Sequence, residues 1–427
     1  MNFVSSMASA LIPTTWPFDS RLLPETACVV GGSVRDALLK RQADYLDLDF
    51  VLPDGAVAIA SAIARRYQAG FVVLDADNQI ARAVFDQATI DFAQQVGPTL
   101  ETDLQRRDFT INAIAYHPQS DRLIDPLNGM ADLQQQTLRM VSRENLAEDP
   151  LRLLRAYRQA AQLGFTIDSN TRRTIHELAP LLQTIAAERI RHELDALLSQ
   201  PKGATCFRMA WQDGLFTTWL PHLSEQHAKQ LAALDKALAT LPNIPGYLTL
   251  LHGWKDTVPA GHYRSWVKAA RLSRLLPLDE EAANRWLNRL KYSRSEGQAI
   301  FRVIQTQPYL ERLVVQGYLS RADQFFLFKT AGTSFPAVSL VALSMGVPTA
   351  TVAELVRRYQ TADDPIAHPT PLVSGKDLMQ GLGLSSGPHI GQLLSAIENA
   401  QASGQLTHGD EALVWAQQWF KEYNMQR

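Results

Sequence analysis

Cysteine is nearly absent from this chain, which has only Cys28 and Cys206 among its 427 residues. Two cysteines are too few for a disulfide scaffold or a cysteine-ligated zinc site, and they favour a reducing, cytoplasmic environment. We find no apolar run long enough to span a bilayer, so no membrane partner is expected. The opening residues 1–17 lack a basic region and contain prolines, which predicts an extension and not a signal peptide.

An excess of charge of one sign is also missing, because 41 Lys and Arg residues against 43 Asp and Glu residues leave a net charge of −2. Taken globally, this balance does not indicate nucleic-acid binding, for which the local distribution of charge matters more. The chain is longer than a single ordinary core requires, and its 46% hydrophobic content is ample for burial. We therefore expect a multi-domain protein.

The most informative stretch begins at residues 28–30, an apolar run typical of a short buried strand. Gly31 and Gly32 follow it, and glycine permits a positive φ and lets backbone N–H groups approach a ligand closely. Residues 34–40 predict a helix whose N-terminal amides would face a phosphate, with Arg35 able to donate to the same anion. On its own, a Gly-Gly pair favours the simpler interpretation of a tight strand-to-helix turn.

Residues 45–52 predict a strand that carries two carboxylates, Asp47 and Asp49, at a spacing of two. Side chains at this spacing project from the same face of a strand. Adjacent carboxylates are costly to bury unless a cation neutralises them, and oxygen ligands suit Mg²⁺, which also binds phosphates. The alternative is an ordinary amphipathic strand with its acids in water, which is the more common meaning of alternating polar and apolar residues. Because the pair follows the glycine turn, it favours a metal site for nucleotidyl transfer.

Asp91 supplies a third carboxylate, in another short β-type run at residues 88–93. Phosphoryl transfer with two metal ions needs such a set, although a strand acid paired with a neighbouring Lys or Arg would have the same sequence. Farther along, Arg106 and Arg107 could hold a triphosphate through bidentate hydrogen bonds. Their alternative is a helix start with Asp108 as the cap and the arginines in solvent.

Residues 148–158 predict a helix with acids in its first turn, a proline near its first position and leucines toward the core. Asp149 and Arg152 lie three apart and would share a face, where an ordinary surface ion pair would mean nothing for function. A fixed carboxylate beside a fixed guanidinium would instead present one acceptor and one donor to a base. That order matches cytosine and adenine and not uracil or guanine.

Together these residues resemble the class II tRNA nucleotidyltransferase and bacterial poly(A) polymerase family. The resemblance covers about the first half of the chain, and it implies an α+β fold with a polymerase-β-like nucleotidyltransferase head, followed by an all-helical neck, body and tail. The matching segments, in family order and spacing, are residues 31–36, 47–49, 106–113, 148–158 and 188–194.

This resemblance implies that Asp47 and Asp49 bind Mg²⁺ and activate the 3′-hydroxyl of a tRNA primer, with Asp91 at the third acidic position. The residues implied to bind the nucleotide, CTP with ATP as the alternative, are Gly31, Gly32, Arg35, Asp36, Arg107, Asn112, Asp149, Arg152, Arg155 and Arg158. Of these, Arg107 would hold the triphosphate, and Asp149 and Arg152 would select the base. The helix at residues 188–194 would brace the pocket.

Two departures from the family pattern stand between Asp91 and Arg106. Gln94 and Gln95 occupy the place where an Arg usually follows the third acid. Complete CCA-adding members also carry roughly ten more residues of flexible loop here. A shortened loop resembles the CC-adding members, which stop after two cytidines.

The resemblance therefore implies a CC-adding enzyme, with complete CCA addition as the first alternative. A poly(A) polymerase is a weaker alternative, because we see no long basic C-terminal extension. A catalytically silent RNA-binding protein is the alternative from a different class, and the intact acids and arginines count against it.

We expect the head at residues 1–138, a neck with the nucleotide-selecting motif at 139–200, a body at 201–358 and a tRNA-binding tail at 359–427. Prolines at 365–371 predict a turn region before the tail, whose two short helices would open at Ser374 and Gly387. In the body, a basic and aromatic series is typical of an RNA backbone contact or of a solvated helical face over buried aromatics. Its members are Arg264, Lys268, Arg271, Arg274, Arg285, Arg289, Lys291, Arg294 and Arg302, with Trp266, Trp286 and Tyr292.

Overall fold

The computed structural model describes residues 11–41, 45–239, 241, 244–252, 254 and 265–425. The chain forms two compact units, the first ending at Pro221 and the second beginning at His222. The predicted head and neck fall in the first unit, together with residues 201–221 of the predicted body. The second unit contains the rest of the predicted body and the predicted tail.

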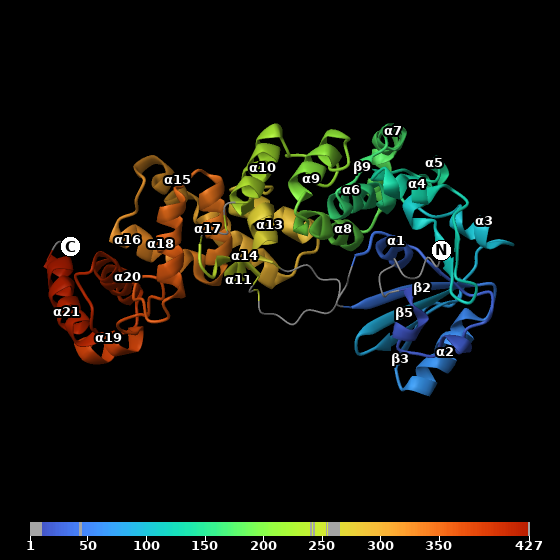
Figure 1. Ribbon diagram of the computed structural model, residues 1–427. Helices are drawn as coiled ribbons and strands as arrows, with labels where there is room; N and C mark the ends of the chain where they lie inside the picture. Colours follow the sequence, from blue (N-terminus) through green and yellow to red (C-terminus); the bar gives the residue numbers. More distant parts are fainter. Residues whose placement is uncertain are drawn as a thin grey trace. The chain divides into compact units, whose positions relative to one another are not determined.

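The first unit contains a seven-stranded sheet in the order β3-β4-β5-β2-β1-β6-β7 (Figure 1). Strands β2 and β5 are parallel, and the other neighbours are antiparallel. Helix α2 (Ala56–Tyr67) packs on β3, β4 and β5. The strands are β1 (Cys28–Val30), β2 (Leu46–Leu52), β3 (Gly70–Asp75), β4 (Ile80–Phe85), β5 (Ala88–Gln94), β6 (Ala115–His117) and β7 (Arg122–Ile124).

Alternation along β2 and β5 sends aromatic residues to one face of the sheet and acids to the other. Phe50 of β2 and Phe92 of β5 stack with their ring centroids 5.4 Å apart. Trp16, from the segment before β1, meets Phe50 edge-on at 5.2 Å. This buried aromatic cluster fixes which face of β2 is turned toward the core, because a one-residue slip would invert every side chain.

Helices make up most of the rest of the first unit. Helix α1 (Gly32–Leu38) follows β1 after its N-cap Gly31, so it begins and ends two residues earlier than the predicted helix at residues 34–40. Helix α6 (Leu151–Leu163) packs against α8 (Ala187–Ser199) and α9 (Gly203–Gln212). The remaining elements are α3 (Leu100–Leu104), η5 (Thr110–Asn112), α4 (Gly129–Gln134), β8 (Thr137–Leu138), α5 (Arg143–Glu148), β9 (Thr166–Ile167), α7 (Ser169–Leu178) and η6 (Ala179–Thr184).

The predicted continuous helix over residues 148–158 is wrong at its start. Helix α5 ends at Glu148, Asp149 is extended with φ −125° and ψ 90°, and α6 begins only at Leu151. Pro150 stands at the N-cap of α6, where its missing N–H costs nothing. Asp149 therefore lies in the turn between two helices and not on the face of one.

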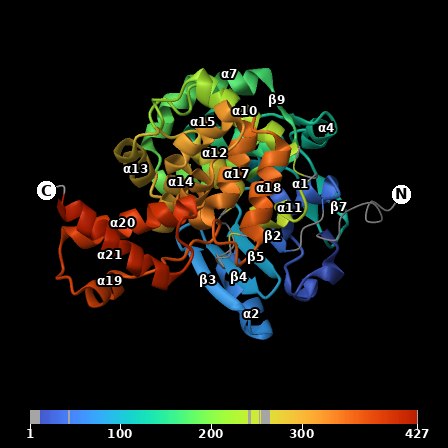
Figure 2. The same ribbon diagram turned by 90° about the vertical axis from the view of Figure 1, so that its left-hand side faces the viewer.

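The described part of the second unit is helical (Figure 2). Its helices in the body are α10 (Glu225–Ala239), α11 (Tyr247–His252), α12 (Trp266–Ser273), α13 (Glu280–Arg289), α14 (Arg294–Gln305), α15 (Gln307–Gln316), α16 (Arg321–Ala331), α17 (Phe335–Ser344) and α18 (Thr349–Gln360). Helices α19 (Gly375–Leu382), α20 (Pro388–Ser403) and α21 (Gly409–Met425) follow a non-helical stretch that contains the predicted proline turns. The predicted helix starts at Ser374 and Gly387 are confirmed, since both residues are N-caps.

The helical stretch Arg321–Ser344 is long and apolar enough to pass as a membrane span by length and composition, contrary to the expectation from the sequence. Its apolar window is 67% buried within the structure, as in a core helix of a soluble protein. The stretch comprises α16 and α17 joined by a short 3₁₀ turn, and helix α17 packs on α10, α12 and α18. Burial in the body thus accounts for its apolar character.

Two members of the predicted basic surface are core residues. The side chains of Lys268 and Arg271 are 2% and 1% exposed, and they pair with Glu296 at 3.1 Å and Asp235 at 2.7 Å. A buried cation needs a buried partner, and these acids supply it. The RNA-contact interpretation is therefore wrong for these two residues, and Arg264 lies outside the described residues.

Candidate active site

Strand β2 presents Asp47 and Asp49 on one face, as predicted, because Leu48 and Phe50 between and beyond them are 0% and 1% exposed on the other. Removal from water, with the neighbouring carboxylates Asp47 and Asp91, raises the pKa of Asp49 to about 6. Removal from water and the charge of Asp91 also raise the pKa of Asp47. Two anions side by side are thus costly here, and a cation between them would remove that cost.

Asp91 lies directly beside Asp49, because these two residues are partners in the parallel register of β5 and β2. On its other side Asp91 faces Arg82 of β4 and accepts hydrogen bonds from Arg82 Nε at 2.7 Å and Nη2 at 2.8 Å. This is the ion-paired arrangement that the sequence left open as an alternative. No cluster of three or more Asp, Glu, His or Cys side chains suited to a metal occurs in the part of the chain that the structure describes.

Sequence reasoning missed Arg82, although its signal was present. Residues 80–85 are apolar apart from Arg82, and the period of two in a strand would place this charge on one face. What the sequence could not supply was the pairing of β4 with β5, which decides that this face is the one with Asp91.

Gly31 lies close to both Asp49 and the predicted triphosphate arginine, Arg107. Its φ is +79°, and a Cβ atom on it would come within 3.1 Å of Arg107 Nη1 and 3.2 Å of Asp49 Oδ2. A side chain at this position would therefore be strained and would crowd both groups. Arg107 also lies 3.5 Å from Asp103, while its buried Nε has no hydrogen-bond partner among the described residues. The unsatisfied N–H of Arg107 Nε, next to a glycine turn that leaves space, suits an anionic ligand.

Arg35 and Asn112 belong to one buried network, 77 residues apart in the sequence. Arg35 donates to Asn112 Oδ1 at 2.7 Å and holds the carboxylate of Asp36 at 2.9 and 3.0 Å. Asn112 donates in turn to Asp108 at 2.9 Å and to Gln159 at 3.1 Å. The network ties α1 to η5 and α6, so in this structure Arg35 and Asn112 fix the glycine turn. A Cβ atom on Gly32 would lie 3.4 Å from Arg35 Nη2.

The two predicted base-selecting residues have separate partners. Asp149 accepts from Arg189 of α8 at 3.1 and 3.2 Å. Arg152 donates to the backbone carbonyls of Arg106 and Asn145, both at 3.0 Å. Asp149 lies before the start of α6, so the two residues do not share a helix face as predicted. Among the described residues, no ion pair joins Asp149 to Arg152. Each side chain is nevertheless held in place, which is what base selection needs.

Arg155 and Arg158 of α6 converge on Glu193 of α8, which is 4% exposed as a side chain. The distances are 3.5 Å from Arg155 and 2.6 Å from Arg158. Arg155 also reaches the buried carboxylate of Asp108 at 3.4 Å. Burial by itself would raise the pKa of Asp108. The charge of Arg155 and the hydrogen bonds from Asn112 and from the backbone N–H of Phe109 outweigh burial and hold this pKa below its usual value. The helix predicted at residues 188–194 thus braces this cluster.

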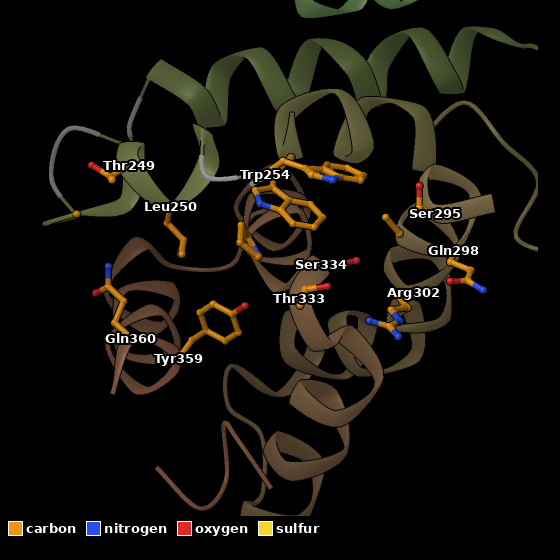
Figure 3. A pocket seen from close by; sticks show the side chains of 14 residues that line it. Thr249, Leu250, Trp254, Ser295, Gln298, Arg302, Thr333, Ser334, Tyr359 and Gln360 are labelled. Atoms are coloured by element: carbon orange, nitrogen blue, oxygen red, sulfur yellow. The ribbon is translucent and has the colours of Figure 1, made fainter. Parts of the chain in front are cut away.

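A large cavity of about 810 Å³ lies in the second unit, away from these residues in the chain (Figure 3). Its lining includes Trp254, Arg302, Ser334 and Tyr359. The volume is that of a small-molecule pocket. None of the predicted site residues lines it, so the chemistry of the carboxylates and not the size of a cavity marks the candidate active site.

Comparison with known proteins agrees with this geometry. The family described as "Poly A polymerase head domain" matches residues 27–139, and "Probable RNA and SrmB- binding site of polymerase A" matches residues 164–226. The family described as "tRNA nucleotidyltransferase domain 2 putative" matches residues 264–416. A sheet with this carboxylate strand and these matches defines the class: the protein is a nucleotidyltransferase with a polymerase-type head.

Similar proteins of known activity narrow the class further. The CC-adding tRNA nucleotidyltransferase of Synechocystis is 45% identical over 94% of this chain and 95% of its own length. The A-adding tRNA nucleotidyltransferase of Deinococcus radiodurans is 31% identical over 93% of this chain and 96% of its own length. The chain therefore belongs to the tRNA nucleotidyltransferase family, whose members are enzymes and are generally metal-dependent.

Solved structures show the same fold. The CCA-adding enzyme of Bacillus stearothermophilus in complex with CTP is similar with a TM-score of 0.69 at 24% identity, covering 94% of this chain and 95% of that one. The Thermotoga maritima CCA-adding enzyme with tRNA is similar with a TM-score of 0.65 at 23% identity, covering 91% and 90%. These likenesses confirm the α+β head followed by helices.

Proposed function

We propose that this protein is a cytoplasmic, Mg²⁺-dependent enzyme that adds two cytidylates to the 3′ end of tRNA and releases pyrophosphate. The observation that carries the proposal is the pair Asp47 and Asp49 on one face of β2, beside Gly31 and Arg107. The 45% identity to a CC-adding enzyme over nearly the whole chain supports the choice of cytidine.

The residues at the carboxylates fit Mg²⁺ because they offer hard oxygen ligands whose pKa values are raised by removal from water and mutual repulsion. Bound there, Mg²⁺ would activate the primer's 3′-hydroxyl and neutralise the phosphates. Arg107, which lies beside the same glycine as Asp49, would hold the triphosphate. In the transfer, the 3′-hydroxyl would lose its proton to solvent, and its oxygen would bond to the α-phosphorus as the bond from that phosphorus to the pyrophosphate breaks.

Asp149 and Arg152 would select the base without a template. Arg189 orients the Asp149 carboxylate as an acceptor for the exocyclic amine of cytosine, and two backbone carbonyls orient the Arg152 guanidinium as a donor. The pair would therefore discriminate against uracil, whose edge presents the reverse order. Arg155 and Arg158, fixed by Glu193, would close the same pocket.

Addition would stop after two cytidines because the connection between β5 and α3 is short. Strand β5 ends at Gln94 and α3 begins at Leu100, so residues 95–99 alone join them. A complete CCA-adding enzyme would need a mobile element here to reshape the pocket for the larger purine. Without it, the pocket should remain at the size of cytidine.

The test is incorporation of labelled CTP and ATP into tRNA that lacks its 3′ terminus, with products sized on a sequencing gel. We expect CTP alone to extend the tRNA by two nucleotides and added ATP in excess to extend it no further. An efficient three-nucleotide product ending in A would establish complete CCA addition instead. A long run of A would indicate a poly(A) polymerase. No incorporation of either nucleotide would refute the proposed nucleotidyltransferase activity.

A further inference from the structure

Three charged residues stand in line across the sheet on the face that carries the candidate active site. Asp49 of β2 is the register partner of Asp91 of β5, and Asp91 is the register partner of Arg82 of β4. Register partners on neighbouring strands project from the same face. The line therefore reads acid, acid, base, from the candidate metal site outward.

Arg82 and Asp91 form a bidentate pair. Nε and Nη2 of the guanidinium donate to the two different carboxylate oxygens at 2.7 and 2.8 Å. The next residue in the line, Val72 of β3, is apolar, so no acid competes for Arg82 from that side. Such a fork is geometrically specific and stronger than a single charge contact.

The pair changes the charge that a cation meets at Asp47 and Asp49. With Arg82 present, Asp91 belongs to a neutral pair, whereas without it three carboxylates would stand together. Each carboxylate oxygen of Asp91 accepts one hydrogen bond from Arg82, so the charge of Asp91 is directed toward that guanidinium.

We propose that Arg82 is a positioning residue that holds Asp91 as a neutral pair, so that the divalent cation is bound by Asp47 and Asp49 and its affinity is limited by Arg82. The inference rests on the proposed function for the identity of the metal site. It assigns Asp91 an electrostatic effect on the cation in place of a direct bond.

The test measures cation binding itself, by titrating the full chain with Mn²⁺ and following free Mn²⁺ by electron paramagnetic resonance without nucleotide or tRNA. Arg82→Ala should tighten Mn²⁺ binding on the order of tenfold, because an anion beside the site loses its counter-charge. Arg82→Lys keeps the charge and should stay within about twofold of the unaltered chain. The double variant Arg82→Ala with Asp91→Asn removes both charges and should return close to the unaltered affinity.

A matched control is available in the same unit. Arg172 forms a bidentate pair with Asp213 at 2.6 and 3.0 Å, with the arginine 39% exposed, against 40% for Arg82. Arg172→Ala also removes one bidentate ion pair, so it controls for the loss of thermal stability that such a loss causes. It should leave the affinity for Mn²⁺ unchanged. Thermal unfolding of each variant shows whether it is folded.

Weaker Mn²⁺ binding in Arg82→Ala would overturn the proposal, since Asp91 would then be a metal ligand that Arg82 merely orients. Unchanged binding would overturn it too, since the pair would then serve only the fold. In turnover, Arg82→Ala should lower kcat for CTP and leave the KM for tRNA unchanged. A chain that binds Mn²⁺ as expected but incorporates no nucleotide would count against the proposed function and not against this inference.

Discussion

At the scale of single residues, the candidate site contains groups whose charge, backbone conformation or missing hydrogen bond is unfavourable in the folded chain. Asp47 and Asp49 repel one another, Gly31 adopts a conformation that other residues rarely take, and Arg107 buries an unsatisfied N–H. Strain and unpaired polar groups of this kind concentrate where a ligand later compensates them. Each of these groups is therefore a direct target for substitution.

Asp49→Asn should lower cytidine incorporation on the order of a thousandfold, because it removes a charge that faces the cation and the reacting phosphate. Binding of tRNA should change little, since Asp49 serves the metal alone. Incorporation rates and a filter-binding assay measure the two effects separately. Turnover near that of the unaltered chain in Mg²⁺ would rule out the assignment of Asp49.

Asp149→Ala should erode base choice and raise incorporation of UTP relative to CTP by roughly tenfold or more, because the acceptor for the cytosine amine is lost. Mg²⁺ dependence should stay as it is. Glu148→Ala is the matched control, since Glu148 is the preceding residue and forms only an exposed ion pair with Arg106 at 3.0 Å. Equal discrimination in Asp149→Ala and Glu148→Ala would place base selection on other residues.

At the scale of elements, helices α6 and α8 act as one unit through buried charges. Glu193 receives both Arg155 and Arg158, and Arg155 links them to Asp108 in the segment after α3. Removing one member of a buried charged network leaves the others desolvated and unpaired, which costs more than losing a surface pair. The stability of this cluster should therefore depend on pH.

Asp108 provides the sign of that dependence. Its pKa in the folded chain lies below the ordinary carboxyl value, so its contribution to stability is present above about pH 4 and is lost as the pH falls through the folded pKa. The thermal unfolding midpoint should decrease between pH 6 and pH 3, and less steeply in Asp108→Asn. Glu281→Gln, in an exposed pair with Arg285, should follow the unaltered chain. Parallel curves for Asp108→Asn and the unaltered chain would contradict this account.

At the scale of the whole molecule, the helices after the proline turns have a core of their own. Leu378, Leu393 and Ile397 are buried together, and Trp415 and Trp419 pack against them. This core holds α19, α20 and α21 as a cluster that follows the nucleotidyltransferase machinery in the chain. The resemblance assigns tRNA binding to this tail.

Leu393→Ala should therefore separate tRNA binding from catalysis. Leu393 is fully buried, and truncation of such a leucine costs about 2–5 kcal/mol. We expect the KM for tRNA to rise several-fold while the KM for CTP stays unchanged, measured by steady-state incorporation. Val414→Ala, at a side chain that is 69% exposed, controls for substitution within the tail. A selective rise in the KM for CTP would show that the tail acts on the nucleotide site.

Several local features of this protein can be predicted from neighbouring residues alone. A period of two places Asp47 and Asp49 on one strand face, a glycine turn begins α1, and Ser374 and Gly387 open their helices, because these features depend on neighbours a few residues away. Which charges meet, in contrast, follows from the folded chain. Arg82 pairs with Asp91, Arg189 with Asp149, and Lys268 with Glu296 in the core, since these choices depend on strand order and helix packing across distant segments. Local periodicity fixes the face on which a side chain lies, and long-range packing fixes what stands opposite it.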